Sequence, residues 1–267
     1  MPRQITAFSN PLVKQVRGLR EKKNRRADGQ FVAEGLRILT EAREMGRLPQ
    51  ILFFAEGTRH PLLDALIAAT EAAGGDVVET NADILGKLTS KDNPQTAVGV
   101  YPLPATDLAG IDRAAAPLWI VAQALRDPGN IGTILRTGDA VGAGGLILID
   151  DCADPFSLES VRASMGAIFT QAIAAARWDD FLLWLRSGPA QLLGTSLQTE
   201  IDYQAPAYAK PCFILVGNEQ AGLPEAYEAE CDLLVKMPMA GKADSLNAAV
   251  ATAVMAYEVI NQWRRAA

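Results

Sequence analysis

The sequence is poor in the residues that build hydrolytic and metal centres, with one histidine and three cysteines in 267 residues. His60 precedes a proline in an expected loop, so a Ser-His-Asp triad or a multi-histidine metal site has little to be built from. Cys152, Cys212 and Cys231 are widely spaced and odd in number, which excludes a disulfide framework and a CxxC metal site. We expect three buried thiols and no metal site.

Long hydrophobic runs are also absent. No apolar stretch reaches the roughly 18 to 20 residues that a membrane helix needs, and the first residues, MPRQITAFSNPLVKQ, lack the unbroken apolar stretch of a signal peptide. The sequence therefore predicts a cytoplasmic protein without a membrane partner. Its 49% hydrophobic residues can supply a sizeable core in each of two domains, the number expected for a chain of this length.

Acidic residues outnumber basic ones, and the resulting net charge of -6 argues against a general polyanion binder. The charge is unevenly distributed, because residues 1–26 hold eight of the 25 Lys and Arg residues and a single acid, Glu21. Such a basic segment indicates a local contact with a polyanion, since phosphates attract Lys and Arg through Coulomb energy and counterion release. A solvated helix face is the alternative interpretation.

The first hundred residues alternate between helix and strand patterns and predict a small α/β domain. The expected elements are a basic helix at 11–23, a strand at 31–33, a helix at 36–45, a strand at 51–55, a helix at 61–73, and strands near 77 and at 97–101. A linker is expected at 102–117, where PLPATDLAGIDRAAAP has three prolines and no long apolar run. One domain is therefore expected at 1–101 and another at 118–267.

The second domain repeats this alternation. The expected elements are a strand at 118–122, a helix at 131–141, a strand at 146–149, helices at 158–169 and 179–186, strands at 191–194, 213–216 and 233–237, and a helix at 245–264. This order predicts a mainly parallel sheet with both faces covered, and ligands bind such sheets at the carboxyl ends of the strands. Polar residues at those ends are therefore the candidates for function.

The first such strand end is followed by NIGTILRTG. Asn130 can cap the next helix there, and Arg136 lies in the second turn of that helix, within a stripe of apolar residues. A guanidinium offers a fork of donors to a phosphate or a developing alkoxide. An ordinary helix cap and an exposed arginine are the alternative interpretation.

The second strand end is followed by LVGNEQAGLP, which has neither a Walker ending nor the GxGxxG pattern. Glu219 disfavours a phosphate here because the two anions repel each other. A carboxylate among backbone amides suits a ligand with hydroxyl, amine or sulfonium groups, and a plain turn is the alternative. The third strand end is followed by PMAGKADSLNAAVA, where Ser245 can cap the last helix and Asn247 projects from its first turn.

Taken together, NIGTILRTG, GNEQAGLP and MPMAGKADSLNAAVA resemble the SpoU (TrmH) branch of the SPOUT class of S-adenosylmethionine-dependent RNA 2'-O-ribose methyltransferases. The resemblance runs from residue 118 to the end of the sequence. The earlier segment RGLREKKNRRADGQFVAEGLRIL looks like the L30e-like substrate-binding domain that precedes the catalytic domain in many members. One departure is visible at Gly138 and Asp139, where members commonly have alanine or another small apolar residue, and it concerns the packing of that helix.

The resemblance implies an α/β fold in which the L30e-like domain precedes a SPOUT domain with a parallel sheet and a deep C-terminal trefoil knot, an exception to the general absence of knots. It implies S-adenosylmethionine as the cofactor and a homodimer whose active site is shared across the interface. It also implies an RNA substrate, and the L30e-like arrangement favours ribosomal RNA by analogy. No metal is required.

Carried over position by position, the resemblance assigns three sets of residues. The catalytic set is Asn130, Arg136, Glu219, Ser245 and Asn247. The cofactor-binding set is Thr195, Gly217, Met237 and Leu246. The RNA-binding set from the basic segment is Arg17, Arg20, Lys22, Lys23, Arg25 and Arg26. We interpret Arg136 as stabilising a developing 2'-alkoxide and working with Glu219, because a guanidinium is a poor general base.

Some alternative functions keep the predicted fold, and one requires a different fold. A tRNA 2'-O-methyltransferase, or a non-catalytic RNA-binding or ribosome-assembly factor, would have the same fold. A nucleotide-dependent oxidoreductase on a doubly wound sheet would need a glycine-rich turn straight after the first strand of the domain. The sequence GAGG at 142–145 instead follows a helix and precedes a strand, which is the wrong context.

Overall fold

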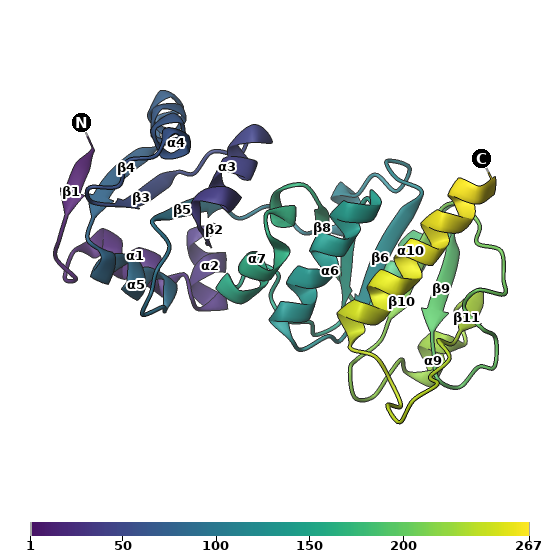
Figure 1. Ribbon diagram of the computed structural model, residues 1–267. Coiled ribbons are helices and arrows are strands. Elements are labelled where there is room, and N and C mark those ends of the chain that lie inside the picture. Colours follow the sequence, from purple (N-terminus) through teal and green to yellow (C-terminus); the bar gives the residue numbers. More distant parts are fainter. Residues whose placement is uncertain (1, 267) are drawn as a thin grey trace. The chain divides into compact units, whose positions relative to one another are not determined.

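The two stretches of alternating helix and strand form two separate units in the computed structural model, which describes residues 2–266 (Figure 1). The N-terminal unit comprises residues up to 104 together with 154–170, and the C-terminal unit comprises 105–153 and residues from 171 onward. The chain first passes between the units inside the expected linker. The segment 154–170, which the sequence pattern places in the second domain, has its contacts within the N-terminal unit.

The N-terminal unit is built on a five-stranded sheet of order β1-β4-β3-β5-β2, in which β5 runs antiparallel to both of its neighbours and the other pairs are parallel. Its strands are β1 (Arg3–Ile5), β2 (Gln30–Glu34), β3 (Ile51–Ala55), β4 (Asp76–Thr80) and β5 (Ala97–Pro102). Its helices are α1 (Pro11–Gly18), α2 (Lys22–Asp28), α3 (Leu36–Glu44), α4 (Pro61–Ala72), α5 (Ala82–Thr89) and α7 (Leu158–Ser164), and a 3-10 turn, η2, spans Ala167–Phe169.

Aromatic side chains explain why the segment 154–170 packs with the N-terminal residues. Phe31 of β2 lies 5.3 Å from Phe156 and 5.9 Å from Phe169, measured between ring centroids. Tyr101 of β5 lies 4.7 Å from Phe169. Tilted aromatic pairs at these distances are favourable beyond the apolar area that they bury. The segment therefore completes the hydrophobic core of this unit.

The basic segment forms two helices, so the prediction of a single helix at 11–23 is wrong. Asn24 Nδ2 donates to the carbonyl of Gly18 at 2.8 Å, and the guanidinium of Arg25 donates to the carbonyls of Leu19 and Arg20 at 2.7 and 2.6 Å. These carbonyls would accept main-chain hydrogen bonds in a continuous helix. The side chain of Arg25 takes over that role at Leu19 and Arg20, and the carbonyl of Gly18 accepts from both Asn24 and the backbone N–H of Glu21, so α1 ends here.

The C-terminal unit is built on a six-stranded, all-parallel sheet of order β11-β9-β10-β6-β7-β8. Its strands are β6 (Leu118–Gln123), β7 (Gly145–Ile149), β8 (Ala172–Ala176), β9 (Gln191–Thr195), β10 (Cys212–Val216) and β11 (Leu233–Val235). Its helices are α6 (Pro128–Val141), α8 (Trp178–Arg186), α9 (Glu225–Glu228) and α10 (Ala248–Ala266), and a 3-10 turn, η1, spans Leu108–Gly110.

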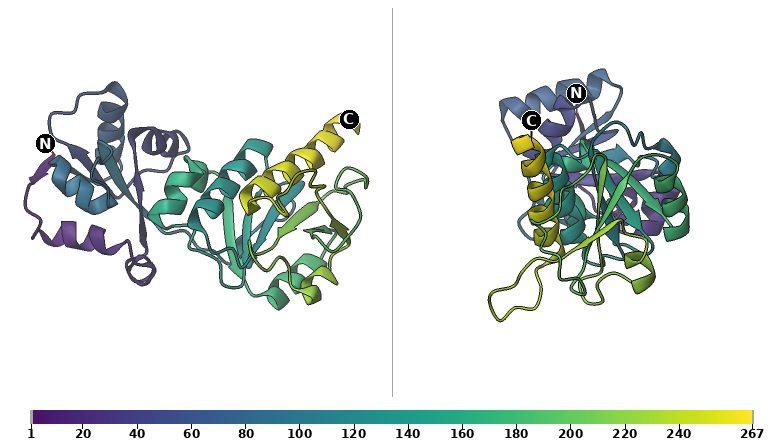
Figure 2. Two further views of the ribbon diagram at one scale, coloured as in Figure 1. Left: turned by 60° about the horizontal axis from the view of Figure 1, so that its bottom comes forward. Right: turned by 90° about the vertical axis from the view of Figure 1, so that its right-hand side faces the viewer.

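Helices cover both faces of this sheet, with α6 and α10 on one side and α8 and α9 on the other (Figure 2). The α/β class and the parallel sheet with two covered faces are therefore confirmed. All strands of the sheet run in the same direction, so the carboxyl ends of β6, β9, β10 and β11 lie along one edge. The strand order reverses beside β6, which is where ligands bind in open α/β sheets. The trefoil knot stays a prediction of the resemblance.

The helix predicted at 158–169 is shorter in the structure. It ends at Ser164, because Met165 and Gly166 adopt positive φ angles of 51° and 101°.

Helix α6 continues unbroken through Gly138, where a Cβ atom would lie 2.7 Å from Oε1 of Gln171. The glycine therefore fits the packing of this helix, and an alanine would displace the end of that side chain.

The three cysteines are free thiols. Cys152 and Cys212 are buried as expected, but Cys231 is partly exposed, so the prediction of three buried thiols is wrong for that residue. Burial raises the pKa of Cys212 to about 12. No helix between residues 2 and 266 is both long and apolar enough to cross a membrane.

Candidate active site

The loop after β10 is closed by hydrogen bonds across its own base. Asn218 N donates to the carbonyl of Gly222 at 3.1 Å, and Gly222 N donates to the carbonyl of Asn218 at 3.0 Å. Oδ1 of Asn218 accepts from the backbone N–H groups of Gln220 and Ala221, each at 3.0 Å. Asn218 Nδ2 donates to the carbonyl of Ala124, in the segment after β6, at 2.8 Å. The loop is therefore fixed both internally and to the neighbouring strand end.

Gly217 is the residue on which this closure depends. A Cβ atom at this position would lie 2.5 Å from the carbonyl carbon of Gly222 and 2.6 Å from the nitrogen of Leu223. Real Cβ atoms do not approach backbone atoms so closely, so only glycine fits. The tight loop places Glu219 at its tip, beside the N-terminal end of α6.

Glu219, Asn130 and Asn247 form a hydrogen-bond chain that joins the three motif segments. Asn130 Nδ2 donates to Oε1 of Glu219 at 3.1 Å, and Asn247 Nδ2 donates to Oδ1 of Asn130 at 2.9 Å. Asn130 is 9% exposed, so it is largely shielded from water. The two bonds use both the nitrogen and the oxygen of its amide group, and they fix the orientation of that group. The structure thus brings together one predicted residue from each motif.

The cap of α6 differs from the sequence-based expectation. Asp127 is the N-cap, and its Oδ1 accepts from the backbone N–H of Asn130 at 2.8 Å. The prediction that Asn130 caps this helix is therefore wrong. Because Asp127 takes over the cap, the side chain of Asn130 is available to reach Glu219.

The beginning of α10 also differs. Oδ1 of Asn247 accepts from the backbone N–H of Ala249 at 2.9 Å, and the helix begins at Ala248. Asn247 is therefore the capping residue, and the predictions that Ser245 caps the helix and that Asn247 lies in its first turn are wrong. Ser245 Oγ donates to Oδ1 of Asp244 at 3.2 Å instead.

Within one chain, Arg136 does not join the hydrogen-bond chain of Glu219, Asn130 and Asn247. It lies six residues after Asn130 on α6, which is roughly 9 Å along the helix axis and about 240° around it. Its side chain is exposed and forms no hydrogen bond or ion pair with residues 2–266. The carboxylate of Glu219 contacts Asn130. The interpretation that Glu219 works with Arg136 therefore needs correction for a single chain.

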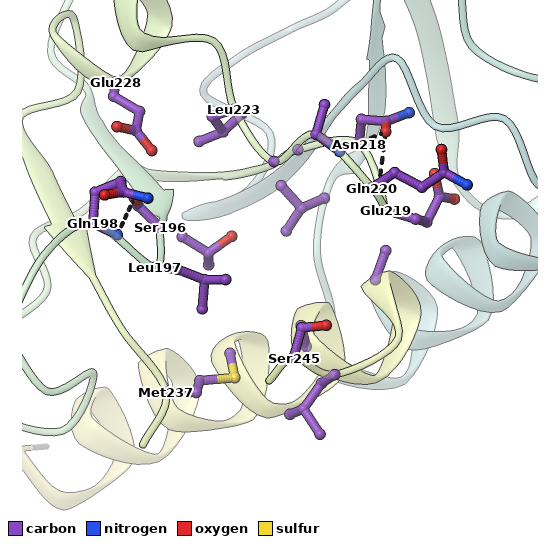
Figure 3. A pocket seen from close by; sticks show the side chains of 18 of the residues that line it. Ser196, Leu197, Gln198, Asn218, Glu219, Gln220, Leu223, Glu228, Met237 and Ser245 are labelled. Carbon is purple, nitrogen blue, oxygen red and sulfur yellow. Dashed lines mark hydrogen bonds between the residues drawn. The ribbon is translucent and has the colours of Figure 1, made fainter. Parts of the chain in front are cut away.

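A cavity of about 990 Å³ opens beside the motif loops (Figure 3). It lies at the carboxyl ends of β9, β10 and β11, and its size is typical of a small-molecule site. The predicted residues that line it are Thr195, Gly217, Glu219, Met237, Ser245 and Leu246. The predicted residues that do not line it are Asn130, Arg136 and Asn247.

Several residues that line the cavity were not among the predicted site residues. Ser196 directly follows β9, and its Oγ accepts from the backbone N–H of Gln198 at 3.0 Å. The rule that polar residues at strand ends form sites would have found Ser196. Glu225 and Glu228 belong to α9, a helix of one turn that the sequence pattern did not reveal. No sequence signal pointed to these two residues.

The charged side chains that line the cavity are all acidic. It contains four carboxylates, and no Lys, Arg or His side chain is among the residues that line it. The carboxylates belong to Glu219, Glu225, Glu228 and Asp244. Such a lining repels phosphate groups and favours a ligand with positive charge or hydrogen-bond donors. Among residues 2–266, no three His, Cys, Asp or Glu side chains are grouped so that they could hold a metal ion.

The basic residues at the N-terminus divide into two groups. Four are exposed and form no side-chain hydrogen bond or ion pair with the part of the chain that the structure describes; these are Arg17, Lys22, Lys23 and Arg26. Arg25 is 3% exposed, and its guanidinium lies 2.5 Å from Oδ2 of Asp154. The prediction that Arg25 contacts RNA is therefore corrected, because this side chain is buried and paired with Asp154 within its own unit.

Arg20 also has a structural contact. It is partly buried, and its guanidinium donates to the carbonyl of Lys87, near the C-terminal end of α5. Burial lowers the pKa of Arg20, and the charges of Arg17 and Arg162 lower it further. The side chain remains near other cations but has less freedom to reach a ligand than its exposed neighbours.

Comparison with known proteins agrees with the family that the three motifs resemble. The SpoU rRNA Methylase family matches residues 117–257, and the MRM3-like substrate binding domain matches residues 10–99. A 23S rRNA (uridine(2479)-2'-O)-methyltransferase of Streptomyces viridochromogenes is 32% identical over 97% of this chain and 92% of its own. A 23S rRNA (guanosine(2553)-2'-O)-methyltransferase of Bacillus subtilis is 29% identical over 96% of this chain and 99% of its own.

Among solved structures, an AdoMet-bound rRNA methyltransferase from Sinorhizobium meliloti matches with a TM-score of 0.90 and 40% identity, covering 97% of each chain. This likeness extends over both units of the chain. The expected resemblance is thereby confirmed. The chain belongs to the SpoU rRNA methylase family.

Proposed function

We propose that this protein transfers a methyl group from S-adenosylmethionine to a ribose 2'-hydroxyl of ribosomal RNA. The observation that carries the proposal is the cavity at the sheet edge, next to the hydrogen-bond chain of Glu219, Asn130 and Asn247. The names of the two relatives specify 2'-O-methylation of 23S rRNA. A cytoplasmic location follows from such a substrate and stays a prediction.

The residues of the cavity fit the cofactor. S-Adenosylmethionine carries one net positive charge near neutral pH, and the lining is acidic without a basic side chain. Thr195, Gly217, Met237 and Leu246 would hold it, and the missing side chain of Gly217 lets the loop close tightly around the site. When bound, the cofactor supplies an electrophilic methyl group on its sulfonium sulfur.

The hydrogen-bond chain would hold Glu219 in place for catalysis. Oε1 of Glu219 is taken by Asn130, so the other carboxylate oxygen is available to a hydroxyl or amine group in the cavity. Asn130 and Asn247 do not line the cavity and therefore act as positioning residues. Fixing a reacting group in this way can contribute several kcal/mol through effective molarity.

Arg136 would act across a homodimer interface. Its exposed guanidinium has no partner within residues 2–266, and α6 packs against α10. Helix α10 has an uncovered apolar face on which Val250 and Tyr257 are each 48% exposed, with the partly exposed Val254 between them. A second copy that covers this face would bring its own α6 nearby. Arg136 would then stabilise the developing 2'-alkoxide in the partner's site, with an RNA phosphate or water taking the proton.

The two domains would divide the work, with residues 1–101 binding the RNA and residues 118–267 performing the transfer. Structured RNA is recognised largely through its shape, phosphates and 2'-hydroxyl groups. The exposed basic side chains of Arg17, Lys22, Lys23 and Arg26 suit phosphate contacts, which position an RNA without reading its sequence.

The decisive experiment is to map 2'-O-methyl groups in total RNA from cells with and without the gene. We expect one or a few ribosomal positions to lose the methyl group, and wild-type protein but not an Asn130→Asp variant to restore it. A loss confined to tRNA would instead support the tRNA methyltransferase. Unchanged methylation, together with intact RNA binding by the purified protein, would support the non-catalytic factor.

A further inference from the structure

Two carboxylates of the cavity have no role in the proposed transfer: Glu225, which is exposed, and Glu228, which is partly buried. Glu219 is held by Asn130, and Asp244 accepts from Ser245. Glu228 belongs to α9, outside the three motifs, and its side chain forms no hydrogen bond or ion pair within residues 2–266. Figure 3 shows its carboxylate turned into the cavity, at the end opposite Glu219.

We propose that Glu228 makes the cavity selective for the charged methyl donor over its neutral product. This inference rests on the proposed function. In the transfer, the bond between sulfur and the methyl carbon breaks and a bond between that carbon and the ribose oxygen forms. The sulfur keeps the electron pair and becomes a neutral thioether, and the 2'-hydroxyl proton leaves to an RNA phosphate or water. The cofactor thus changes from one net positive charge to none.

A carboxylate in the cavity distinguishes these two molecules through Coulomb energy. It stabilises a ligand with net positive charge and has little effect on the product, whose ammonium and carboxylate charges cancel. Glu228 is partly exposed, so water screens its field. We therefore expect a contribution of about three- to tenfold to the affinity for the donor. The same preference favours release of the product after each turnover.

Glu228 differs in this respect from a residue that recognises the nucleoside by hydrogen bonding. Adenosine is common to donor and product, so a carboxylate that accepts from its hydroxyl or amine groups would bind both equally well. Loss of such a contact would weaken both complexes by the same factor. The two roles are therefore separated by measuring both ligands.

The test is isothermal titration calorimetry of the full-length protein with S-adenosylmethionine, S-adenosylhomocysteine and sinefungin, an analogue with an amine in place of the sulfonium. Glu228→Gln removes the charge and keeps the size of the side chain. Glu230→Gln is the matched control, because Glu230 is exposed nearby and does not line the cavity. Thermal unfolding of each variant would establish that it is folded.

We expect Glu228→Gln to weaken binding of the two charged ligands about three- to tenfold and to change the product's affinity less than twofold. Added salt should reduce the wild-type preference, because screening weakens the field. The control should behave as wild type. An equal loss for donor and product, or no loss at all, would overturn the role of Glu228 alone. If wild-type protein bound neither donor nor product, the proposed function itself would fail.

Discussion

Asn130 Nδ2 lies 3.1 Å from Oε1 of Glu219, although the two residues are 89 positions apart in the sequence. The contact links the beginning of α6 to the loop after β10. On its other side the same amide accepts from Asn247, at the beginning of α10. Only a group that both donates and accepts satisfies the two neighbours, which explains why an amide suits this position.

An Asn130→Asp variant should therefore lose most of its activity. The new carboxylate keeps an acceptor for Asn247 but places a second anion beside Glu219, and these charges repel. We expect kcat to fall by about 10²–10³, the range seen when one oriented catalytic contact is lost. Steady-state methyl transfer measures this change, and near-normal turnover would contradict the role of the chain.

The double variant Asn130→Asp with Glu219→Gln provides the control. It reverses donor and acceptor, because the amide introduced by Glu219→Gln can donate to the new carboxylate, so the contact between the two side chains is restored. We expect thermal stability and cofactor affinity to return toward wild-type values. Turnover should stay low, because the charge of Glu219 is itself needed for catalysis, and recovered turnover would show that only the placement of this side chain matters.

Arg136 provides a test of the shared active site. Arg136→Ala and Glu219→Gln should each be inactive as homodimers, since every site lacks one group. When the two variants are co-expressed, each mixed dimer has one site in which both groups are wild type. Random assembly of two-fold dimers should then restore about a quarter of wild-type activity. Activity of the mixture no higher than that of the single variants would show that Arg136 acts within its own chain or not at all.

The parts of the fold that depend on local pattern could be predicted from the sequence. The buried strands β6, β7 and β10 are nearly continuous apolar runs, and polar residues after the carboxyl ends of β6, β10 and β11 identified the site. Strand β8 was missed because AIAAA in Ala172–Ala176 has four alanines and a single β-branched residue, Ile173, which is too weak a strand signal. The packing of 154–170 with the N-terminal unit depends on aromatic contacts between distant residues, and no local pattern predicts such contacts.

In the candidate site, too, local sequence patterns could be read in advance, but contacts between distant residues could not. Motif spacing identified Glu219, Asn130 and Asn247, but not that they bind one another. The cap of α6 was assigned to the wrong residue because Asp127 and Asn130 both have side chains that cap helices. Glu228 was missed because α9 has a single turn, too short for a helical period to show.

The exposed bases of the N-terminal helices should carry the electrostatic part of RNA binding. A variant with Gln at Arg17, Lys22, Lys23 and Arg26 should bind RNA more weakly, and the slope of log K against log salt should fall by up to about three, because fewer counterions are released. Filter binding at several salt concentrations measures this slope. Gln at Arg47 and Arg59, which are exposed elsewhere in the same unit, should have little effect. Equal losses in both variants would indicate a non-specific effect of charge.

Arg25 should behave differently from these bases, since its partner is Asp154 in the same unit. Arg25→Met leaves a mostly buried carboxylate without its cation and removes the donors that end α1. We expect the free energy of unfolding to fall by about 3–5 kcal/mol, as for other broken buried pairs. Urea unfolding measures the loss. The salt dependence of RNA binding by the folded variant should match wild type, and a reduced slope would show that Arg25 does contact phosphate.

Cys212 should make the protein less stable in alkaline solution. Burial raises the pKa of this thiol to about 12, whereas an unfolded cysteine has a pKa of about 8.5. Between these values the folded chain holds a proton that the unfolded chain has lost, so the free energy of unfolding falls as pH rises. The contribution is complete below about pH 8.5 and declines by up to about 1.4 kcal/mol per pH unit above it. From about pH 7 to pH 10, wild type should lose about 2 kcal/mol more than Cys212→Ala, because the variant lacks the titrating group. A difference between the two proteins that does not change with pH would contradict this assignment.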